Sequence, residues 1–446
     1  MLLWGLVLGA WCFSLPLFAE SASVNGPSVH VTKVGENIDL VTVLRLAGSQ
    51  NLDVQIARER LAEAKANQTS AQWQFFPWLA PGISYRHHEG RVQAVDGVIF
   101  DASKQSYSPG VALNAQVDLG ESYYRSLAAK QFTKAADHAL SAQRQDSALA
   151  AAQGYFDLLF AQSATEVARE SVRISTNYQS QIEQAVEAGV AFRGDALRVK
   201  VQSRRNQLAL EQAEQEQKLA SAKLAQILRL DPTVELQAEN SELIPLSLTA
   251  TNAALDALVQ QAMENRAELK QGKAASQAAR ENKNGAIYGP MIPSLGAQIS
   301  AGGLGGGTGG SFGNFGDQED YLFGLSWRIG PGGLFDSGRI KSAEARAKSA
   351  KLSLEKLRDE ISRQVVDSAV KANSFRRQIN MSKEALQTAE ESLKLAQLRK
   401  EFAVGIVLEN IQAEEDLTRS RRDYLRAIAE HNKAQYNLAH ALGQKF

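Results

Sequence analysis

The sequence predicts an α+β membrane protein that is built from two tandem structural repeats. Three observations predict it: an internal duplication with one constant offset, pairs of short alternating strands, and very long helical stretches. Each repeat has the same plan. A medium helix is followed by two strands with a long loop between them, a very long helix, a break and a second medium helix.

One shift in numbering relates the two halves of the chain. Pro77 matches Pro293, and Gly189 matches Gly405, each 216 positions further along. The stretch FFPWLAPGIS is echoed by MIPSLGAQIS at the same offset. A constant offset over this distance indicates one repeated structural unit rather than two unrelated domains.

The domain order follows from this duplication and from the composition of the ends. We expect residues 1–19 to be a secretory signal peptide, because they form an apolar run with a small-residue exit, although the basic start is missing. A transmembrane anchor is the alternative for this stretch. An N-terminal segment, 20–37, leads into the first repeat, 38–230. A mixed linker in the equatorial region, 231–252, joins it to the second repeat, 253–446.

Composition argues against several classes of function. Lys plus Arg and Asp plus Glu are both 49, so net charge gives no case for nucleic acid as a partner. The only cysteine, Cys12, lies in the signal segment, so we expect no disulfide in the mature chain. The six histidines and four methionines show no ligand spacing, and no catalytic constellation stands out. We therefore expect no enzyme, no cofactor and no metal site.

Each repeat contains one helix about twice as long as its neighbours. In the first repeat we expect helices over 38–74, 121–187 and 195–229. At 1.5 Å per residue the long helix spans roughly 100 Å, and the medium ones span roughly 55 and 52 Å. Because the two shorter lengths add up to the long one, both medium helices can lie end to end beside it.

The strands are more informative about function. We expect strands near 82–90, 110–119 and 321–329. Apolar and polar residues alternate along VALNAQVDL and YLFGLSWRI, and about nine residues are enough for a tilted strand to cross a bilayer. One face would meet lipid and the other water. A soluble sheet with one buried face alternates in the same way and is the alternative.

The ends of the strands carry two further signals. Aromatic residues that could form an interfacial girdle flank them, namely Trp73, Phe75, Phe76, Trp78 and Tyr288. The stretches 89–106 and 302–320 read as surface loops, the second of them mobile and rich in glycine. A Gly-x-Gly-x-x-Gly match at 305–310 precedes a strand and lacks a lysine, so we do not expect a nucleotide site there.

Four strands cannot close a membrane barrel, because the smallest transmembrane barrels have eight. An open sheet edge in lipid would leave backbone groups unpaired, at a cost of several kcal/mol each. The chain must therefore oligomerise. Twelve strands from three copies are the simplest closed arrangement with a useful pore, so we expect a homotrimer.

The whole mature chain resembles the TolC-like outer-membrane channels, which serve efflux pumps and type I secretion. The resemblance is carried by LDALVQQAMENRAEL at 255–269, by the two glycine-centred breaks and by PGGLFDSGRIKSAEARAK at 331–348. The last stretch is close to the family's strand-to-helix signature, Leu-Phe-Asp-x-Gly-Arg. Its matching residues here are Leu334, Phe335, Asp336, Gly338 and Arg339.

The resemblance implies a trimeric, passive exit duct. A twelve-stranded β-barrel would lie in outer-membrane lipid and continue as a twelve-helix α-barrel in the periplasm. Its tips, at 186–200 and 402–416, would open on docking a periplasmic adaptor (a membrane fusion protein) and an inner-membrane pump or ABC transporter. Docking would fall to Gly189, Val190, Gly405, Ile406 and Val407. Of these we expect the apolar side chains of Val190, Ile406 and Val407 to be exposed, or else to pack locally between the two hairpins. A soluble periplasmic coiled-coil adaptor or scaffold without a pore is the alternative. The exported cargo stays open.

The family's gate chemistry carries over only in part. The acidic residue six positions after the break glycine is Asp195 in the first repeat, but its counterpart in the second repeat is Ile411. Glu414 keeps acidic character nearby, and Val407 replaces a clamping arginine. Arg193 could instead pair with Glu409 or Glu414, although Arg193 and Asp195 could also cap a helix. We expect the gate to consist of Arg193, Asp195, Glu409, Asn410, Ile411 and Glu414.

Overall fold

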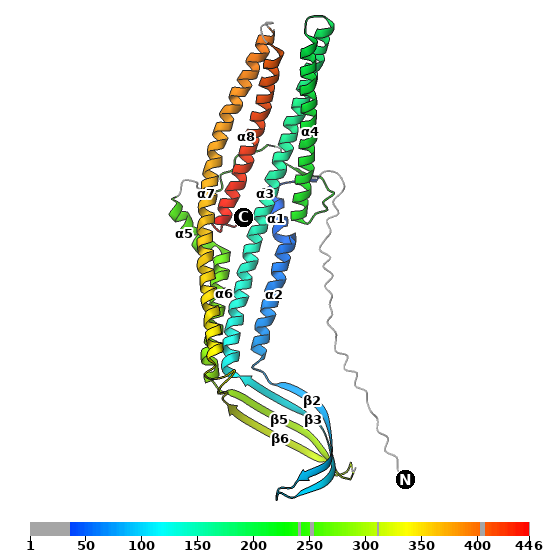
Figure 1. Ribbon diagram of the computed structural model, residues 1–446, viewed down its shortest axis with the longest axis vertical. Helices are drawn as coiled ribbons and strands as arrows, with labels where there is room; N and C mark the ends of the chain where they lie inside the picture. Colours follow the sequence, from blue (N-terminus) through cyan, green and yellow to red (C-terminus); the bar gives the residue numbers. More distant parts are fainter. Residues whose placement is uncertain (1–35, 240–241, 250–253, 310–311, 402–405, 446) are drawn as a thin grey trace, which may run out of the picture.

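The computed structural model describes residues 36–239, 242–249, 254–309, 312–401 and 406–445. It is an elongated molecule in which helices occupy most of the length and a four-stranded sheet lies at one end (Figure 1). In this part of the chain, no helix is both long enough and apolar enough to cross a membrane.

Some sequence predictions fall outside these residues. They are the signal peptide 1–19, nearly all of segment 20–37, and Gly405, the break glycine of the second repeat. The structure therefore says nothing of them.

Two long helices run along the helical part of the molecule. Helix α3 spans Leu119–Glu187 with 69 residues, and α7 spans Ser337–Glu401 with 65. Each is followed by a helix that folds back beside it, α4 at Arg193–Leu228 and α8 at Val407–Ala441. The bounds of α3 and α4 confirm the long and returning helices that the periodicity predicts for the first repeat.

The first medium helix of each repeat is two helices rather than one. The predicted helix over 38–74 breaks at Asn51, whose extended backbone cannot continue a helix and whose side chain accepts a hydrogen bond from the Asp53 amide at 2.8 Å. Arg266 makes the equivalent break in the second repeat. The resulting helices are α1 at Leu40–Gln50, α2 at Leu52–Trp73, α5 at Leu255–Asn265 and α6 at Ala267–Tyr288.

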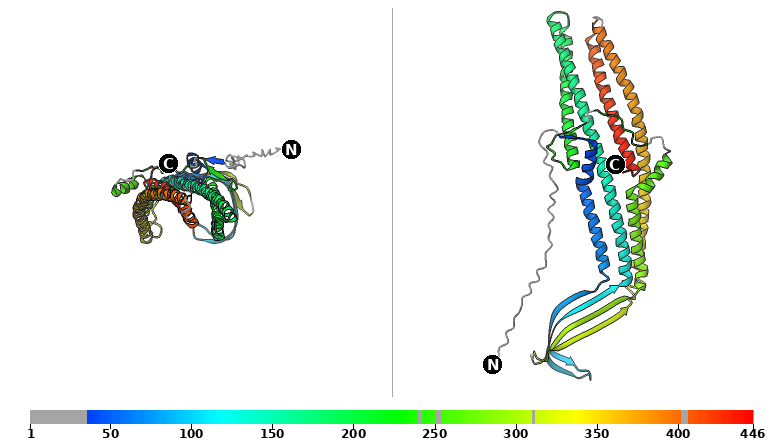
Figure 2. Two further views of the ribbon diagram at one scale, coloured as in Figure 1. Left: turned by 90° about the horizontal axis from the view of Figure 1, so that it is seen from above. Right: turned by 180° about the vertical axis from the view of Figure 1, so that it is seen from behind.

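The helices stack as their lengths suggest. Helices α1 and α2 cover the half of α3 nearer the sheet, and α4 covers the other half (Figure 1). Helices α5, α6 and α8 are arranged in the same way along α7. Helix α3 also packs against α6 and α8, which joins the two repeats into one curved wall when seen from above (Figure 2).

The four long strands form one antiparallel sheet in the order β2-β3-β5-β6. They extend into the predicted loops, since most of 89–106 and of 302–320 is paired strand, whereas the strand predicted over 321–329 ends at Ser326. Backbone pairing needs no apolar alternation, so the polar ends of these strands gave no sequence signal. The strands are β2 at Trp78–Gln93, β3 at Ile99–Asp118, β5 at Ser294–Thr308 and β6 at Gly316–Ser326.

The glycine run in β5 has a steric cause. The rings of Tyr107 and Phe315 stack with centroids 5.8 Å apart and lie against the strand. A Cβ at Gly305 would come within 2.4 Å of the Tyr107 ring, and one at Gly303 within 2.1 Å of the Phe315 ring. Glycine at these positions therefore makes room for aromatic rings, rather than marking a mobile loop.

The sheet separates apolar from polar side chains as the alternation predicts. Cross-strand pairing places one apolar row on one face, formed by Leu79, Leu113, Ile299 and Tyr321. No described helix covers this face, and Ile83 and Phe323 are 82% and 66% exposed. A soluble sheet with one buried face is therefore not what the protomer forms. Trp73, Phe76 and Trp78, predicted girdle residues, lie exposed where the sheet meets the helices.

The main core lies at the middle of the helical part, where α1, α3, α4 and α8 meet. Here the linker contains a strand that sequence reasoning missed, β4 at Leu236–Ala238, which pairs in parallel with β1 at Glu36–Ile38. Beyond β4 the linker runs along α8. Asn432 accepts a hydrogen bond from the Leu246 amide at 2.8 Å and donates one to the Ile244 carbonyl at 2.9 Å. The linker thus ties both repeats together.

Candidate functional site

The turn between α3 and α4 is a glycine C-cap. Gly189 has φ 71°, the left-handed region that glycine adopts without strain. The Val190 amide donates to the Ala185 carbonyl at 2.9 Å, and the Gly189 amide donates to the Val186 carbonyl at 3.0 Å. These two bonds define a Schellman motif, so the structural role predicted for Gly189 is confirmed.

Apolar side chains lie exposed at both hairpin tips. Val190 is 80% exposed and Ile406 is 66% exposed, as expected of residues available for docking. Phe192, which the sequence reasoning passed over, is equally open at the start of α4. The expectation that Val407 is exposed was wrong, because it is half-buried against side chains of the neighbouring hairpin.

Four buried residues join the two hairpins just behind their tips, and we call them the tip cluster. Tyr178 and Ile182 come from α3, Val199 from α4 and Ile411 from α8. Ile411, at the position where the resembling family carries an acid, is 7% exposed. It therefore packs against the other hairpin, and Asn410 beside it is buried as well.

Three of the predicted gate residues converge on Tyr178. Burial raises the pKa of the Tyr178 hydroxyl, the hydrogen-bonding Asn410 side chain opposes this, and the charges of Glu414 and Asp195 raise the pKa further. Tyr178 was not predicted from the sequence. Its only signal there is that it is a large aromatic residue in an otherwise polar stretch of helix before Gly189.

The ion pair suggested between Arg193 and Glu409 is not formed within the protomer. Glu409 lies 2.9 Å from Arg399 of α7, so this contact holds the second hairpin together. Asp195 lies 3.4 Å from Arg198, one turn further along α4. Arg193 is exposed at the first turn of α4 and pairs with no residue in the described parts of the chain. Neither Arg193 nor Asp195 is the N-cap, which is Phe192.

The strand-to-helix motif works as a capped turn. Asp336 accepts a hydrogen bond from the Arg339 amide at 3.0 Å, which caps the start of α7, and another from the Gly332 amide at 2.9 Å. These two amides hold the pKa of the Asp336 carboxyl below its usual value. Phe335 has φ 67° and is almost fully exposed, while the Leu334 amide closes the turn.

Arg339 connects this turn to the first repeat. Its guanidinium lies 3.4 Å from the Glu121 carboxylate of α3 and donates to the Ala286 carbonyl of α6 at 3.4 Å. The motif therefore ties the start of α7 to the first repeat and to α6, at the opposite end of the helical part from the tip cluster (Figure 1).

Replacing Asp336 by Ala should lower the thermal midpoint of the protein at pH 7, because it removes a helix cap and a turn contact. The pKa of this carboxyl is depressed in the folded state, so the carboxylate stabilises the fold at pH values above the usual aspartate pKa of 3.8, and this stability is lost as pH falls through the depressed folded value. Melting followed by circular dichroism at pH 7, and again at a pH below the depressed folded pKa, tests this. Asp359→Ala, an exposed site on α7, is the control. A difference that stays constant with pH would contradict the assignment.

One group of side chains has metal-ligand character. Ligand atoms of Asp146, Glu268 and His440 lie within 4.8 Å of one another. However, both Glu268 oxygens accept hydrogen bonds from Arg266, at 2.7 and 3.0 Å, and His440 lies 2.8 Å from Asp146. The positive guanidinium of Arg266 would repel a metal ion bound to Glu268. The group is therefore better explained by contacts among its own charged and polar side chains than by a metal site.

Comparison with known proteins addresses the family. The model of the outer membrane efflux protein family matches residues 43–228 and 258–444. None of the curated proteins matches the chain. The fold is similar to that of several solved structures at identities too low to show more than the fold.

Three of these structures are representative. A membrane protein from Pseudomonas aeruginosa has a TM-score of 0.80 at 19% identity, with 93% of this chain and 92% of that chain covered. The Campylobacter jejuni CmeC outer membrane channel has a TM-score of 0.80 at 13% identity, covering 91% and 85%. The outer membrane protein VceC from Vibrio cholerae has a TM-score of 0.77 at 18% identity, covering 91% and 96%.

The family match spans most of both repeats and agrees with the duplicated arrangement of strands and long helices. The chain belongs to the outer membrane efflux protein family and is an outer-membrane channel protein with a periplasmic helical extension, not an enzyme.

Proposed function

We propose that three copies of this chain form a passive exit duct, with a twelve-stranded barrel in the outer membrane and a twelve-helix tunnel in the periplasm. Energy comes from an inner-membrane pump or ABC transporter, which is linked to the duct by a periplasmic adaptor. The duct serves a tripartite efflux pump or a type I secretion system.

The observation that carries this proposal is the uncovered, open-edged sheet. Strands β2 and β6 each have one neighbour only among the described strands, so both edges offer unpaired backbone groups. On its apolar face, the edge-strand side chains Leu79, Ile83, Tyr321 and Phe323 are exposed. Edge-to-edge pairing of three such sheets satisfies the backbone and leaves the apolar face for lipid.

The opposite face suits a water-filled pore. Asn114 and Gln298 face each other across β3 and β5, and Ser300 faces Asp320 across β5 and β6. A hollow of about 400 Å³ on the sheet is lined largely by glycine, alanine and polar residues of this kind. Small and polar linings support passage of solutes through the barrel.

The tips are the proposed gate. The tip cluster holds the two hairpins of a protomer together, and around it lie Asp195, Asn410 and Glu414. Opening requires the hairpins to separate at 186–200 and 402–416, which exposes this cluster. We propose that the adaptor binds at the turns, on Gly189, Val190, Gly405, Ile406 and Val407, and supplies that free energy. Arg193 and Glu409 line the same end.

The soluble adaptor or scaffold remains the second candidate. It accounts for the two hairpins, but it leaves the exposed apolar face of the sheet without a partner. Large exposed apolar patches on a soluble protein favour aggregation. The exposure of this face therefore favours the duct.

Native mass measurement of the detergent-extracted protein separates the two candidates. The duct predicts extraction from the outer-membrane fraction only with detergent, and a particle with the mass of three mature chains. A soluble, monomeric protein that remains in the supernatant would contradict the duct and favour the adaptor.

A further inference from the structure

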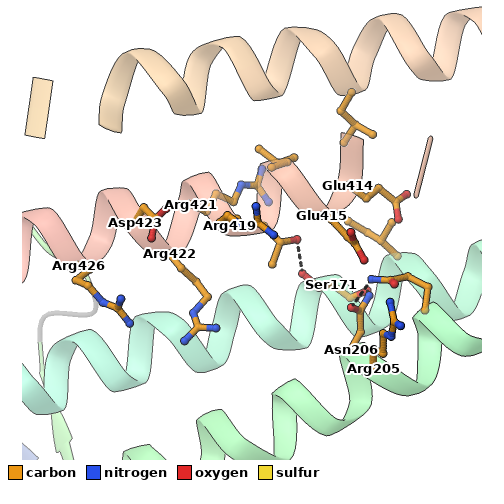
Figure 3. A pocket seen from close by; sticks show the side chains of 15 residues that line it. Ser171, Arg205, Asn206, Glu414, Glu415, Arg419, Arg421, Arg422, Asp423 and Arg426 are labelled. Atoms are coloured by element: carbon orange, nitrogen blue, oxygen red, sulfur yellow. Dashed lines mark hydrogen bonds between the residues drawn. The ribbon is translucent and has the colours of Figure 1, made fainter. Parts of the chain in front are cut away.

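A groove between the two helical hairpins holds a row of arginines. Its volume is about 520 Å³, and it is lined by residues of α3, α4, α7 and α8 (Figure 3). We infer that this groove binds an organic anion that carries a carboxylate, sulfonate or phosphate group. The inference rests on the proposed duct, since it names the class of solute that the duct would hold in transit.

Helical spacing places three guanidinium groups on one side of α8. Arg419, Arg422 and Arg426 occupy positions i, i+3 and i+7, which share a helix face. At the helical rise the row extends over roughly 10 Å. Like charges at these spacings repel each other. A bound anion would offset that repulsion.

These arginines lack the carboxylate partners that several other arginines of the hairpins have. Arg419 and Arg422 form no ion pair with any residue in the described ranges of the protomer, and Arg426 lies over the Phe160 ring at 5.7 Å. Elsewhere on the hairpins, Arg173 pairs with Glu170 and Arg399 with Glu409. The row is therefore not held in ion pairs among the described residues, and the arginines that line the groove outnumber its three acidic residues.

Acidic residues of the groove lie mainly at its other end. Glu414 and Glu415 are nearer the tip, whereas Arg422 and Arg426 point into the groove at the opposite end (Figure 3). Asp423 is the one acidic lining residue at that end, where it is outnumbered by the arginines. Arg421 is drawn away, toward Glu390 of α7 at 3.9 Å. The anionic group therefore fits best between Arg422 and Arg426.

The other walls suit an organic molecule rather than a bare ion. Ile174 adds an apolar surface, and Asn206 and Ser171 add polar groups from the first hairpin. The arginine side chains are exposed to solvent within the groove, so a solute can reach them. Arginine forms paired hydrogen bonds with carboxylate, sulfonate and phosphate groups, which favours these anions over halides.

Binding of 1-naphthalenesulfonate to the purified full-length protein in detergent tests the inference. Equilibrium dialysis at low ionic strength should detect saturable binding, and the triple variant Arg419→Gln, Arg422→Gln, Arg426→Gln should bind roughly tenfold more weakly or worse. The neutral analogue 1-naphthalenemethanol should not bind at this site. The three side chains are exposed, so their replacement leaves the packing intact.

A charge-matched variant distinguishes the groove from a general effect of net charge. Arg280→Gln, Arg346→Gln, Arg358→Gln removes the same charge from exposed sites outside the groove and should bind as the unchanged protein does. The inference would be overturned if both triple variants bound 1-naphthalenesulfonate equally weakly, or if neither bound it more weakly than the unchanged protein. Equal binding of the neutral analogue would also overturn it. Binding is measured without any transport, so a failed duct and a failed site give different results.

Discussion

Replacing Ile411 by Ala is expected to raise the conductance of single channels several-fold. Ile411 is the buried member of the tip cluster that comes from the second hairpin, and it packs against Tyr178, Ile182 and Val199. Truncating a buried isoleucine to alanine costs about 2–5 kcal/mol. The substitution destabilises only the closed state, in which the hairpins touch. The equilibrium between closed and separated tips therefore shifts toward separated tips.

A matched control lies two turns along the same helix. Leu417 is equally buried, but it packs within the second hairpin against Leu393 and Ala396 of α7. Leu417→Ala should therefore lower stability without raising conductance. Equal conductance in the two variants and the unchanged protein would show that the tip cluster does not hold the gate closed.

Replacing Arg266 by Met is expected to destabilise the protein by about 3–5 kcal/mol, because it leaves a poorly solvated carboxylate without its partner. Arg266 is 4% exposed and donates to both oxygens of Glu268. It also donates to the His440 carbonyl at the end of α8 at 3.3 Å and to Gln364 of α7 at 3.2 Å. One side chain thus connects three helices at the break between α5 and α6.

The destabilisation should be measured as a shift in denaturant midpoint of the detergent-solubilised protein. Arg280→Met, which removes an exposed arginine from α6, should have almost no effect. The double variant Arg266→Met, Glu268→Leu should recover part of the loss, since no unpaired charge remains. A double variant less stable than Arg266→Met would contradict this explanation.

The helical architecture was predictable because its signals are local. Alanine-rich apolar stripes, the break at Gly189 and the 216-residue offset depend on residues close in sequence or on simple repetition. The break at Asn51 was not predicted, since the helical periodicity continues on both sides of it. Likewise β1 and β4 have three residues each and pair across most of the first repeat, which no local pattern reports.

For the candidate gate, the sequence indicated where the hairpins turn but not which side chains meet behind the turns. The departure from the family at Ile411 was visible in the sequence, yet its burial depends on two hairpin tips lying side by side. For the same reason Tyr178 was missed, although Asp195, Asn410 and Glu414 all act on its pKa. The partner of Glu409 proved to be Arg399 on the same hairpin, a pairing across a turn that the sequence spacing alone did not favour over Arg193.

Planar-bilayer recording of the purified protein tests the central claim most directly. The proposed duct predicts discrete current steps of one size class, low in the unchanged protein and higher after Ile411→Ala. A folded, detergent-extracted protein that produces no discrete steps, in either the unchanged or the Ile411→Ala form, would contradict a transmembrane channel.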